Sequence, residues 1–243
     1  MDSEPTLHTS SATLANMAQQ NARFAPSTRR PRSASITRST AQYRTLATNY
    51  DATTPRIEFL RTQAHQLLSL RPGDTVLDVG CGTGKSLPAL SRAVGPTGRV
   101  IAIEPCAEMM RFARARVREL SLSNVDLIEA PAAALCEAIE TDSIDAVLMM
   151  FTHDVLQSSA ALDHLLAVAK NGARFVLAGG KLFSGALSLL NPWVEWRQKP
   201  YCTTFENYDA PWRKLFDTQA LSATCVHPRY MGIAYIAHAV RAK

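Results

Sequence analysis

Short runs of apolar residues recur through the middle of the chain, and stretches with helical periodicity separate them. Continuous runs of this length are typical of strands that are buried on both faces in a parallel sheet. The strand candidates cover residues 76–79, 100–104, 124–128, 143–151 and 173–178. The alternation of strands with helices predicts an α/β fold.

The stretches between these strands place apolar residues on one side of a helix. Helices are predicted over residues 55–70, 85–94, 160–169 and 211–219. Another predicted helix follows Glu104 and ends near residue 120. Two β-rich runs follow at residues 222–227 and 232–240, divided by Pro228. The pattern therefore predicts one further pair of strands at the end of the chain.

Residues 181–212 interrupt the alternation and hold an unusual share of the aromatic residues. They contain Trp193, Trp196, Trp212, Phe183, Tyr201, Phe205 and Tyr208. Aromatic rings gathered outside the regular core suggest the wall of a pocket for a second substrate. The alternative is a satellite hydrophobic cluster beneath a long loop.

Composition and charge divide the chain into two parts. Its 243 residues, 47% of them apolar, suit one α/β domain. The first fifty residues carry six arginines against Asp2 and Glu4, so they hold most of the net charge of +5. We expect a basic, disordered tail over residues 1–42 and one domain over residues 43–243. Basic charge confined to such a tail is weak evidence for nucleic acid, and no nucleic-acid partner is expected.

The chain offers no uncharged apolar span near the ~20 residues that cross a membrane. We therefore expect a soluble, cytoplasmic protein with no stable membrane insertion. The five cysteines show no Cys-x-x-Cys or other metal-ligand spacing, which predicts reduced thiols and no metal site. The sequence does not predict the oligomeric state.

The most specific stretch runs from Asp78 to Gly84, where glycines alternate with other residues directly after a strand. Glycine lets the backbone turn tightly and lets a ligand lie against its N–H groups. A phosphate-binding P-loop would need glycine in place of Val79. A dinucleotide fold would need the spacing Gly-x-Gly-x-x-Gly, which is absent here.

This Asp-x-Gly-x-Gly-x-Gly turn closely resembles the first motif of the class I S-adenosylmethionine (SAM)-dependent methyltransferases. Glu104 supports the resemblance, because an acid at the end of the next strand, twenty residues after Gly84, can accept hydrogen bonds from both ribose hydroxyls of a nucleoside. The resemblance implies SAM as cofactor. It also implies a Rossmann-like, doubly wound, mainly parallel sheet of seven strands with an antiparallel last strand.

The resemblance also implies a set of cofactor-binding residues at the ends of the first four strands. They are Asp78, Gly80, Cys81, Gly82, Gly84, Glu104, Pro105, Ala130, Pro131, Met150 and Phe151. Many family members have Asp or Asn near the position of Pro131, where it contacts the adenine amino group. Adenine recognition here would therefore fall to backbone groups or to another side chain.

Three residues are candidates for catalysis. Tyr43 and Tyr50 precede the first strand, in a segment that folds over SAM in the family, and an aromatic face attracts a sulfonium cation. His153 follows the fourth strand, and a neutral imidazole there could take a proton from the acceptor. The alternative for each of the three is a packing role.

The function that these features predict is SN2 transfer of the SAM methyl group to a small-molecule nucleophile. One alternative is attack on the aminocarboxypropyl chain, by an external nucleophile or by the amine of SAM itself in a ring closure. Residues 54–61 and 230–232 are loosely similar to aminocarboxypropyl transferases. The other alternative is a non-catalytic protein that only binds SAM.

Overall fold

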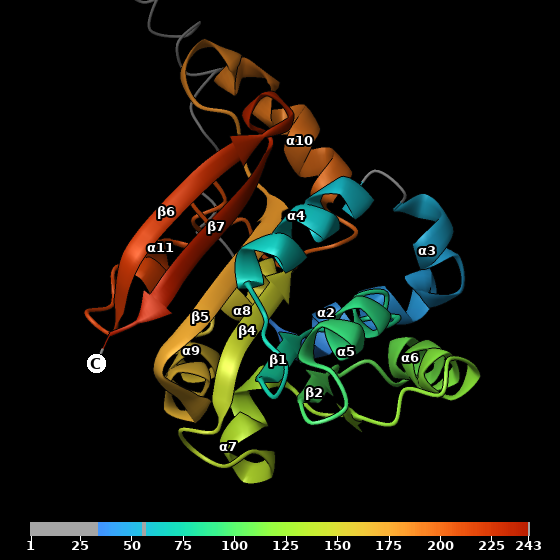
Figure 1. Ribbon diagram of the computed structural model, residues 1–243. Helices are drawn as coiled ribbons and strands as arrows, with labels where there is room; N and C mark the ends of the chain where they lie inside the picture. Colours follow the sequence, from blue (N-terminus) through green and yellow to red (C-terminus); the bar gives the residue numbers. More distant parts are fainter. Residues whose placement is uncertain (1–33, 55–56, 243) are drawn as a thin grey trace, which may run out of the picture. The chain divides into compact units, whose positions relative to one another are not determined.

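Seven strands form one mixed sheet in the computed structural model, which describes residues 34–54 and 57–242 (Figure 1). The strands are β1 (Thr75–Val79), β2 (Arg99–Ile103), β3 (Val125–Ile128), β4 (Ile144–Met150), β5 (Ala169–Gly180), β6 (Leu221–Arg229) and β7 (Ala234–Arg241). They lie in the order β3-β2-β1-β4-β5-β7-β6. Only β7 runs antiparallel to its neighbours, β5 and β6. The predicted fold class is confirmed.

Helices and short helical turns connect the strands. The α-helices are α2 (Ile36–Leu46), α3 (Tyr50–Thr53), α4 (Glu58–Leu68), α5 (Leu87–Val94), α6 (Ala107–Glu119), α7 (Leu135–Ala138), α8 (His153–Leu156), α9 (Ser159–Val168), α10 (Asn191–Gln198) and α11 (Arg213–Phe216). The 3-10 turns are η1 (Ala47–Asn49), η3 (Ala132–Ala134), η4 (Gly185–Leu190) and η5 (Tyr230–Gly232). No helix among these described residues is both long enough and apolar enough to cross a membrane.

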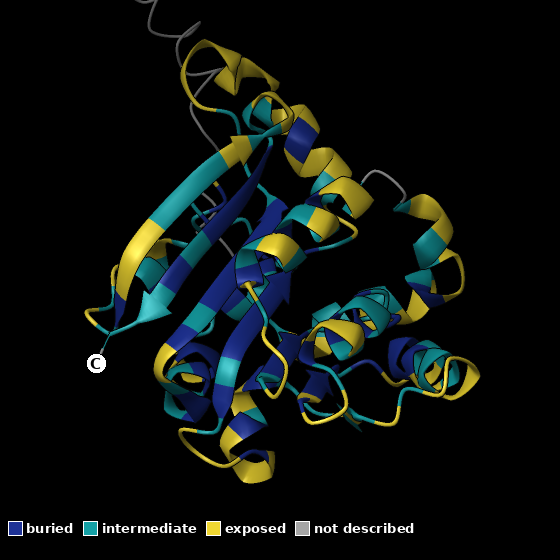
Figure 2. Cartoon of the chain, viewed as in Figure 1, coloured by how far each residue is buried: buried dark blue, intermediate teal, exposed yellow. Residues whose placement is uncertain are grey.

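The sheet separates two layers of hydrophobic core, because successive residues of a strand point to opposite faces. On β1, Val76 packs with α4 and α5, whereas Leu77 and Val79 pack with α7, α9 and α11. Figure 2 shows the central strands as the most buried part of the molecule. Burial on both faces explains why the strands of this sheet read as continuous apolar runs.

Two predicted elements have different limits in the structure. The predicted helix over residues 211–219 is only the four-residue α11. Residues 170–172, between the predicted helix over residues 160–169 and the predicted strand over residues 173–178, lie inside β5, which begins at Ala169. There the Lys170 ammonium donates to Asp145 Oδ1 at 2.8 Å and ties the early part of β5 to β4.

The predicted boundary between tail and domain at residue 42 is wrong, because it falls inside α2. The Ser35 side chain caps this helix by accepting a hydrogen bond from Arg38 N, so helical structure is present before residue 42. Residues 1–33 of the predicted tail lie outside the described residues.

Helix α2 is fastened to the loop after α10 by three hydrogen bonds. Ser35 N donates to Thr203 Oγ1 at 3.0 Å, and the Tyr43 hydroxyl donates to the Tyr201 carbonyl at 3.0 Å. Gln42 Nε2 donates to the Lys199 carbonyl at 3.1 Å. The segment before β1 is thus joined to the predicted aromatic segment, far away in the sequence.

Candidate functional site

The glycine turn leaves the carboxyl end of β1 with positive φ at each of its glycines, +66° at Gly80, +58° at Gly82 and +77° at Gly84. A Cβ at position 82 would meet no atom within 4 Å, so this backbone faces open space. A Cβ at position 84 would lie 2.7 Å from Leu87 Cδ1 and 3.1 Å from Ala113 Cβ. Gly82 therefore leaves room for a ligand, whereas Gly84 leaves room for packing.

Glu104 follows the end of β2 and binds two loops through its carboxylate. Oε2 accepts from Gly82 N at 3.1 Å and Oε1 accepts from Cys106 N at 2.8 Å. Burial raises the pKa of Glu104 to about 7, although these two backbone hydrogen bonds act in the opposite direction. Each oxygen keeps a free lone pair, so the carboxylate can still accept from ligand hydroxyls.

A first cavity of about 320 Å³ opens beside these two features. Its lining includes many of the residues that sequence analysis proposed. They are Tyr43, Tyr50, Gly80, Gly82, Glu104, Pro105, Pro131, Met150, Phe151 and His153. The carboxyl ends of β1, β2 and β4 meet here, as expected for ligand sites in open parallel sheets.

Four of the proposed cofactor contacts, Asp78, Cys81, Gly84 and Ala130, do not line this cavity, and their contact with the cofactor stays a prediction. Cys81 N donates to the Ile103 carbonyl and joins the turn to β2. Asp78 is buried, and Oδ2 has no hydrogen-bond partner among the described residues. Burial raises the pKa of Asp78 to about 7.

A second cavity of about 730 Å³ lies on the other side of an aromatic wall. Tyr43, Tyr50, Phe151 and Tyr201 line both cavities. The Tyr50 ring lies edge-on to Tyr43 and to Tyr201, with centroid distances of 6.0 and 6.5 Å. These four residues, called the shared wall below, are the place where ligands in the two cavities would approach one another.

The three tryptophans of residues 181–212 have different surroundings, and the segment is neither wholly a pocket wall nor wholly a hydrophobic cluster. Trp193 lines the second cavity. Trp196 is 70% exposed and lines neither cavity. Trp212 packs on Tyr235 of β7, with ring centroids 4.7 Å apart, and belongs to the core.

His153 lies at the start of α8 and lines the first cavity but not the second. Its ring packs edge-on against Tyr208 with centroids 4.5 Å apart, and both ring nitrogens are buried without a hydrogen-bond partner among the described residues. Burial lowers the pKa of His153 to about 4. The imidazole is therefore neutral at pH 7 and is a weak base.

Sequence analysis missed Asp51, which fastens α3 to the glycine turn. Its Oδ1 accepts from Thr83 Oγ1 at 2.6 Å and its Oδ2 accepts from Arg116 Nη2 at 2.9 Å. Burial opposes ionisation, but the hydrogen bonds from Thr83 and Arg116 outweigh it, and the pKa of Asp51 is lowered. The only signal in the sequence was its position next to Tyr50.

The first cavity also receives side chains that no sequence pattern indicated. Ser35, Ile36 and Ser39 reach it from the start of α2, and Asp154 reaches it from α8. Asp154 Oδ2 accepts from Thr203 Oγ1 at 2.8 Å. These contacts depend on pairing between distant segments, which hydrophobic periodicity does not reveal.

The residues of the first cavity fit SAM in three respects. Gly82 offers an open backbone surface, and Glu104 offers a carboxylate acceptor suited to ribose hydroxyls. Tyr43 and Tyr50 offer aromatic rings, which attract a sulfonium cation. Pro131 lines the cavity but supplies no side-chain hydrogen bond for adenine, as the sequence indicated.

Comparison with known proteins shows which family this part of the chain resembles. Residues 76–172 match the family model described as a methyltransferase domain. The demethylmenaquinone methyltransferase of Oceanobacillus iheyensis is 29% identical over 140 residues, which cover 55% of this chain and 58% of the relative. The nocamycin O-methyltransferase of Saccharothrix syringae is 36% identical over 140 residues, covering 56% and 46%. The chain thus spans about half the length of these curated relatives.

A solved structure agrees in fold. The SAM-dependent methyltransferase of Aquifex aeolicus superposes with a TM-score of 0.54 at 22% identity, covering 83% of this chain and 98% of that one. None of these three proteins is named for aminocarboxypropyl transfer, so that alternative gains no support. The matched region holds the glycine turn, Glu104 and the end of β4. These comparisons support the resemblance of residues 76–172 to the methyltransferase domain of the class I SAM-dependent methyltransferases, whose cofactor is SAM.

Proposed function

We propose that the protein transfers the methyl group of SAM to an apolar small molecule bound in the second cavity. The observation that carries this proposal is the shared wall, because Tyr43, Tyr50, Phe151 and Tyr201 border both cavities. A nucleophile in the second cavity would have to meet the sulfonium methyl at this wall.

SAM brings a methyl group that is already activated, and in-line attack on it releases S-adenosylhomocysteine. The residues of the chain would hold SAM and the acceptor and align the nucleophile with the methyl carbon and the sulfur. Glu104 and Gly82 would fix the nucleoside, and the rings of Tyr43 and Tyr50 would stabilise the positive charge before transfer. In the proposed arrangement the methyl carbon faces the second cavity across the shared wall.

Proton removal is the step for which the site is least equipped. His153 has a pKa of about 4, and a base this weak removes protons poorly near pH 7. The proposal therefore favours an acceptor that arrives already ionised, or an aromatic carbon that loses its proton after the transfer. We therefore propose that His153 contacts the ligand in the first cavity and does not act as the base.

The second cavity suggests the class of acceptor. Aromatic and aliphatic side chains dominate its lining, among them Trp193, Ile233 and Leu60. Arg197 supplies a cation, and its guanidinium lies 5.4 Å from the centroid of the Trp193 ring. This combination suits a ring-bearing apolar molecule with one anionic or hydrogen-bond-accepting group. Two relatives are named for small molecules, demethylmenaquinone and nocamycin.

The test is identification of the thioether product by mass spectrometry. The purified protein is incubated with SAM alone and with a panel of phenols, quinols and enols that carry apolar substituents. S-adenosylhomocysteine that forms only with an acceptor supports the proposal. Methylthioadenosine above the spontaneous background contradicts methyl transfer, and its formation without acceptor indicates ring closure within SAM. Binding of SAM with no product across the panel supports the non-catalytic alternative.

A further inference from the structure

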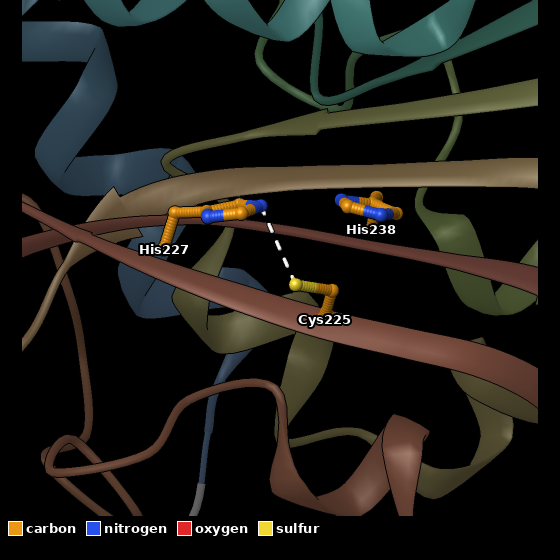
Figure 3. Close-up of side chains that lie close together, drawn as sticks. All are labelled: Cys225, His227 and His238. Carbon is orange, nitrogen blue, oxygen red and sulfur yellow. Dashed lines mark hydrogen bonds between the residues drawn. The ribbon is translucent and has the colours of Figure 1, made fainter.

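Three side chains that can bind a soft metal ion lie together on the β6–β7 hairpin, outside both cavities. They are Cys225 and His227 of β6 and His238 of β7, and one potential ligand atom from each lies within 4.8 Å of the other two (Figure 3). Cys225 Sγ is 3.4 Å from His227 Nε2. None of the three residues lines the first or the second cavity.

Strand geometry explains how the sequence brings these residues together. Cys225 and His227 are two residues apart, so their side chains share one face of β6. His238 is the direct register partner of Cys225 on the neighbouring strand. The three ligands therefore come from a paired ladder, and no Cys-x-x-Cys spacing marks them in the sequence.

A bulge in β6 gives Cys225 its orientation. Ser222 pairs with Val240 and Cys225 pairs with His238, so three steps along β6 match two steps along β7. The extra residue reverses the side-chain alternation, and Ala223 within it has a φ of +51°. With a regular ladder, Thr224 would stand opposite His238 and Cys225 would point to the other face.

The hydrogen bonding, stacking and exposure of these side chains leave them able to bind an ion. His238 Nδ1 is buried and has no hydrogen-bond partner among the described residues. The rings of His227 and His238 are stacked with centroids 5.6 Å apart and an interplanar angle of 22°. All three residues are partly exposed, so an ion can reach them from solvent.

We propose that Cys225, His227 and His238 form a binding site for Zn²⁺. One thiolate and two imidazoles are donors that Zn²⁺ prefers, whereas Mg²⁺ and Ca²⁺ require oxygen ligands. Zinc–ligand bonds are about 2.0–2.3 Å long, so atoms within 4.8 Å of one another need to move by only about 1 Å to share one ion. Three protein ligands leave the fourth tetrahedral position to water.

The proposed role of the ion is structural. β6 is an edge strand of the sheet and is paired only with β7. An ion bound to both strands would cross-link that edge close to the bulge, where the ladder of backbone hydrogen bonds is interrupted. The thiol of Cys225 would lose its proton to solvent as the Zn–S bond forms.

The experiment uses the full-length protein, stripped of metal with a chelator and then titrated with Co²⁺ and with Zn²⁺. The expected result is one ion per chain, with a thiolate-to-Co²⁺ charge-transfer band that Zn²⁺ removes by displacement. Cys225→Ser should abolish the band, and His238→Asn should weaken the affinity by about 100-fold or more, since loss of an outer-shell partner alone costs 10–100-fold.

Two matched variants serve as controls, and thermal unfolding supplies a second readout. Cys136→Ser removes an exposed thiol on α7, and His164→Asn removes a histidine of α9; both should leave the titration unchanged. Zn²⁺ should raise the Tm of the wild type and of these controls but not that of Cys225→Ser, because only a chain that binds the ion is stabilised by it. Absence of the charge-transfer band, or equal affinity in wild type and Cys225→Ser, overturns the proposal.

Discussion

The two sides of the first cavity are built in different ways. On one side, the glycine turn and Glu104 lie at the ends of neighbouring parallel strands, and the backbone of Gly82 itself donates to the carboxylate. On the other side, α2 and α3 are held by long-range contacts, such as the hydrogen bond between Tyr43 and Tyr201, which are 158 residues apart. The side formed by the glycine turn and Glu104 is thus fixed by local backbone geometry. The opposite side, formed by α2 and α3 and called the cover from here on, depends on contacts between distant segments.

This difference predicts which property a substitution on each side of the cavity should change. A change in the turn should alter cofactor affinity directly, because the backbone of Gly82 and the carboxylate of Glu104 line the first cavity. A change in the cover should act mainly on ligand exchange or on the acceptor. Five predictions test this division, from the largest expected effect to the smallest.

Gly82→Leu should abolish most SAM binding, with a rise in Kd of about 100-fold or more, because the new side chain would fill the space in front of the turn. Gly172→Leu is a matched control, since Gly172 also has positive φ, +82°, and open space around it. Each variant should lose about 1–2 kcal/mol of unfolding free energy through the left-handed backbone. Calorimetry and denaturant unfolding measure the two effects. Equal SAM affinity in both variants would contradict a ligand at Gly82.

Glu104→Gln should weaken SAM binding by about 1.5–3 kcal/mol, the range for hydrogen bonds to a charged group. Glu108→Gln, at the start of α6, is the control, because Glu108 pairs with Arg44 at the surface and lines neither cavity. Calorimetry gives the Kd for SAM of the wild type, Glu104→Gln and Glu108→Gln, and only Glu104→Gln should bind more weakly. Unchanged affinity in Glu104→Gln would remove this residue from the cofactor site.

Glu104 also predicts a pH dependence. Its pKa in the folded chain is about 7, above the ordinary value of 4.5, because the side chain is buried. Its contribution to stability is therefore fully present below about pH 4.5 and is lost as the pH rises through about 7. SAM binding has the opposite slope, since the ionised carboxylate is the better acceptor. Unfolding and SAM titrations at about pH 6 and about pH 8 should show both slopes, and both should be smaller in Glu104→Gln.

Trp193→Ala should raise the KM for an acceptor by about tenfold, roughly 1.4 kcal/mol, and leave the Kd for SAM unchanged, because Trp193 lines only the second cavity. Trp196→Ala is matched in chemistry and lies on the same helix, α10, but lines neither cavity. Steady-state kinetics with the best acceptor of the panel measure the contrast. A joint loss of SAM affinity and Tm in Trp193→Ala would assign this residue to the core.

Asp51→Asn should have the smallest effect, a several-fold faster dissociation of SAM with a loss of about 0.5–1 kcal/mol of stability. The pair with Arg116 is partly exposed, and such pairs contribute little to stability. Stopped-flow dissociation measures the rate. Asp209→Asn breaks an exposed pair with Arg213 instead and should leave the rate unchanged. A slower dissociation in Asp51→Asn would contradict the role of α3 as part of the cover.

The sequence predicted that the glycine turn and Glu104 lie together, because their signals are local. A strand buried on both faces reads as an apolar run, and the turn after β1 requires glycine at positions 80, 82 and 84. The same pattern did not separate turn residues that face the cavity from those that face away. Gly84 shows this limit, since its lack of a side chain serves packing against Ala113.

The positions of α2 and α3 and the cluster of Cys225, His227 and His238 could not be predicted in this way. Helix α2 has no buried residues and so carries no strong hydrophobic signal, and the arginines around it indicated a tail. The cluster of Cys225 and His238 depends on a bulge, and a shift of one residue in register is invisible to a pattern with a period of two. Both features are products of long-range pairing.

The fastening of α2 to the loop after α10 has a consequence for the order of events in a catalytic cycle. Ser35 and Tyr43 line the first cavity, and their hydrogen-bond partners Thr203 and Tyr201 lie in a loop that also contributes to the shared wall. An opening of α2 wide enough to release a spent nucleoside would therefore disturb the wall that holds the acceptor. Under the proposed function, release of the nucleoside and release of the methylated product would therefore be coupled, and the rate of turnover would depend on how often this helix detaches.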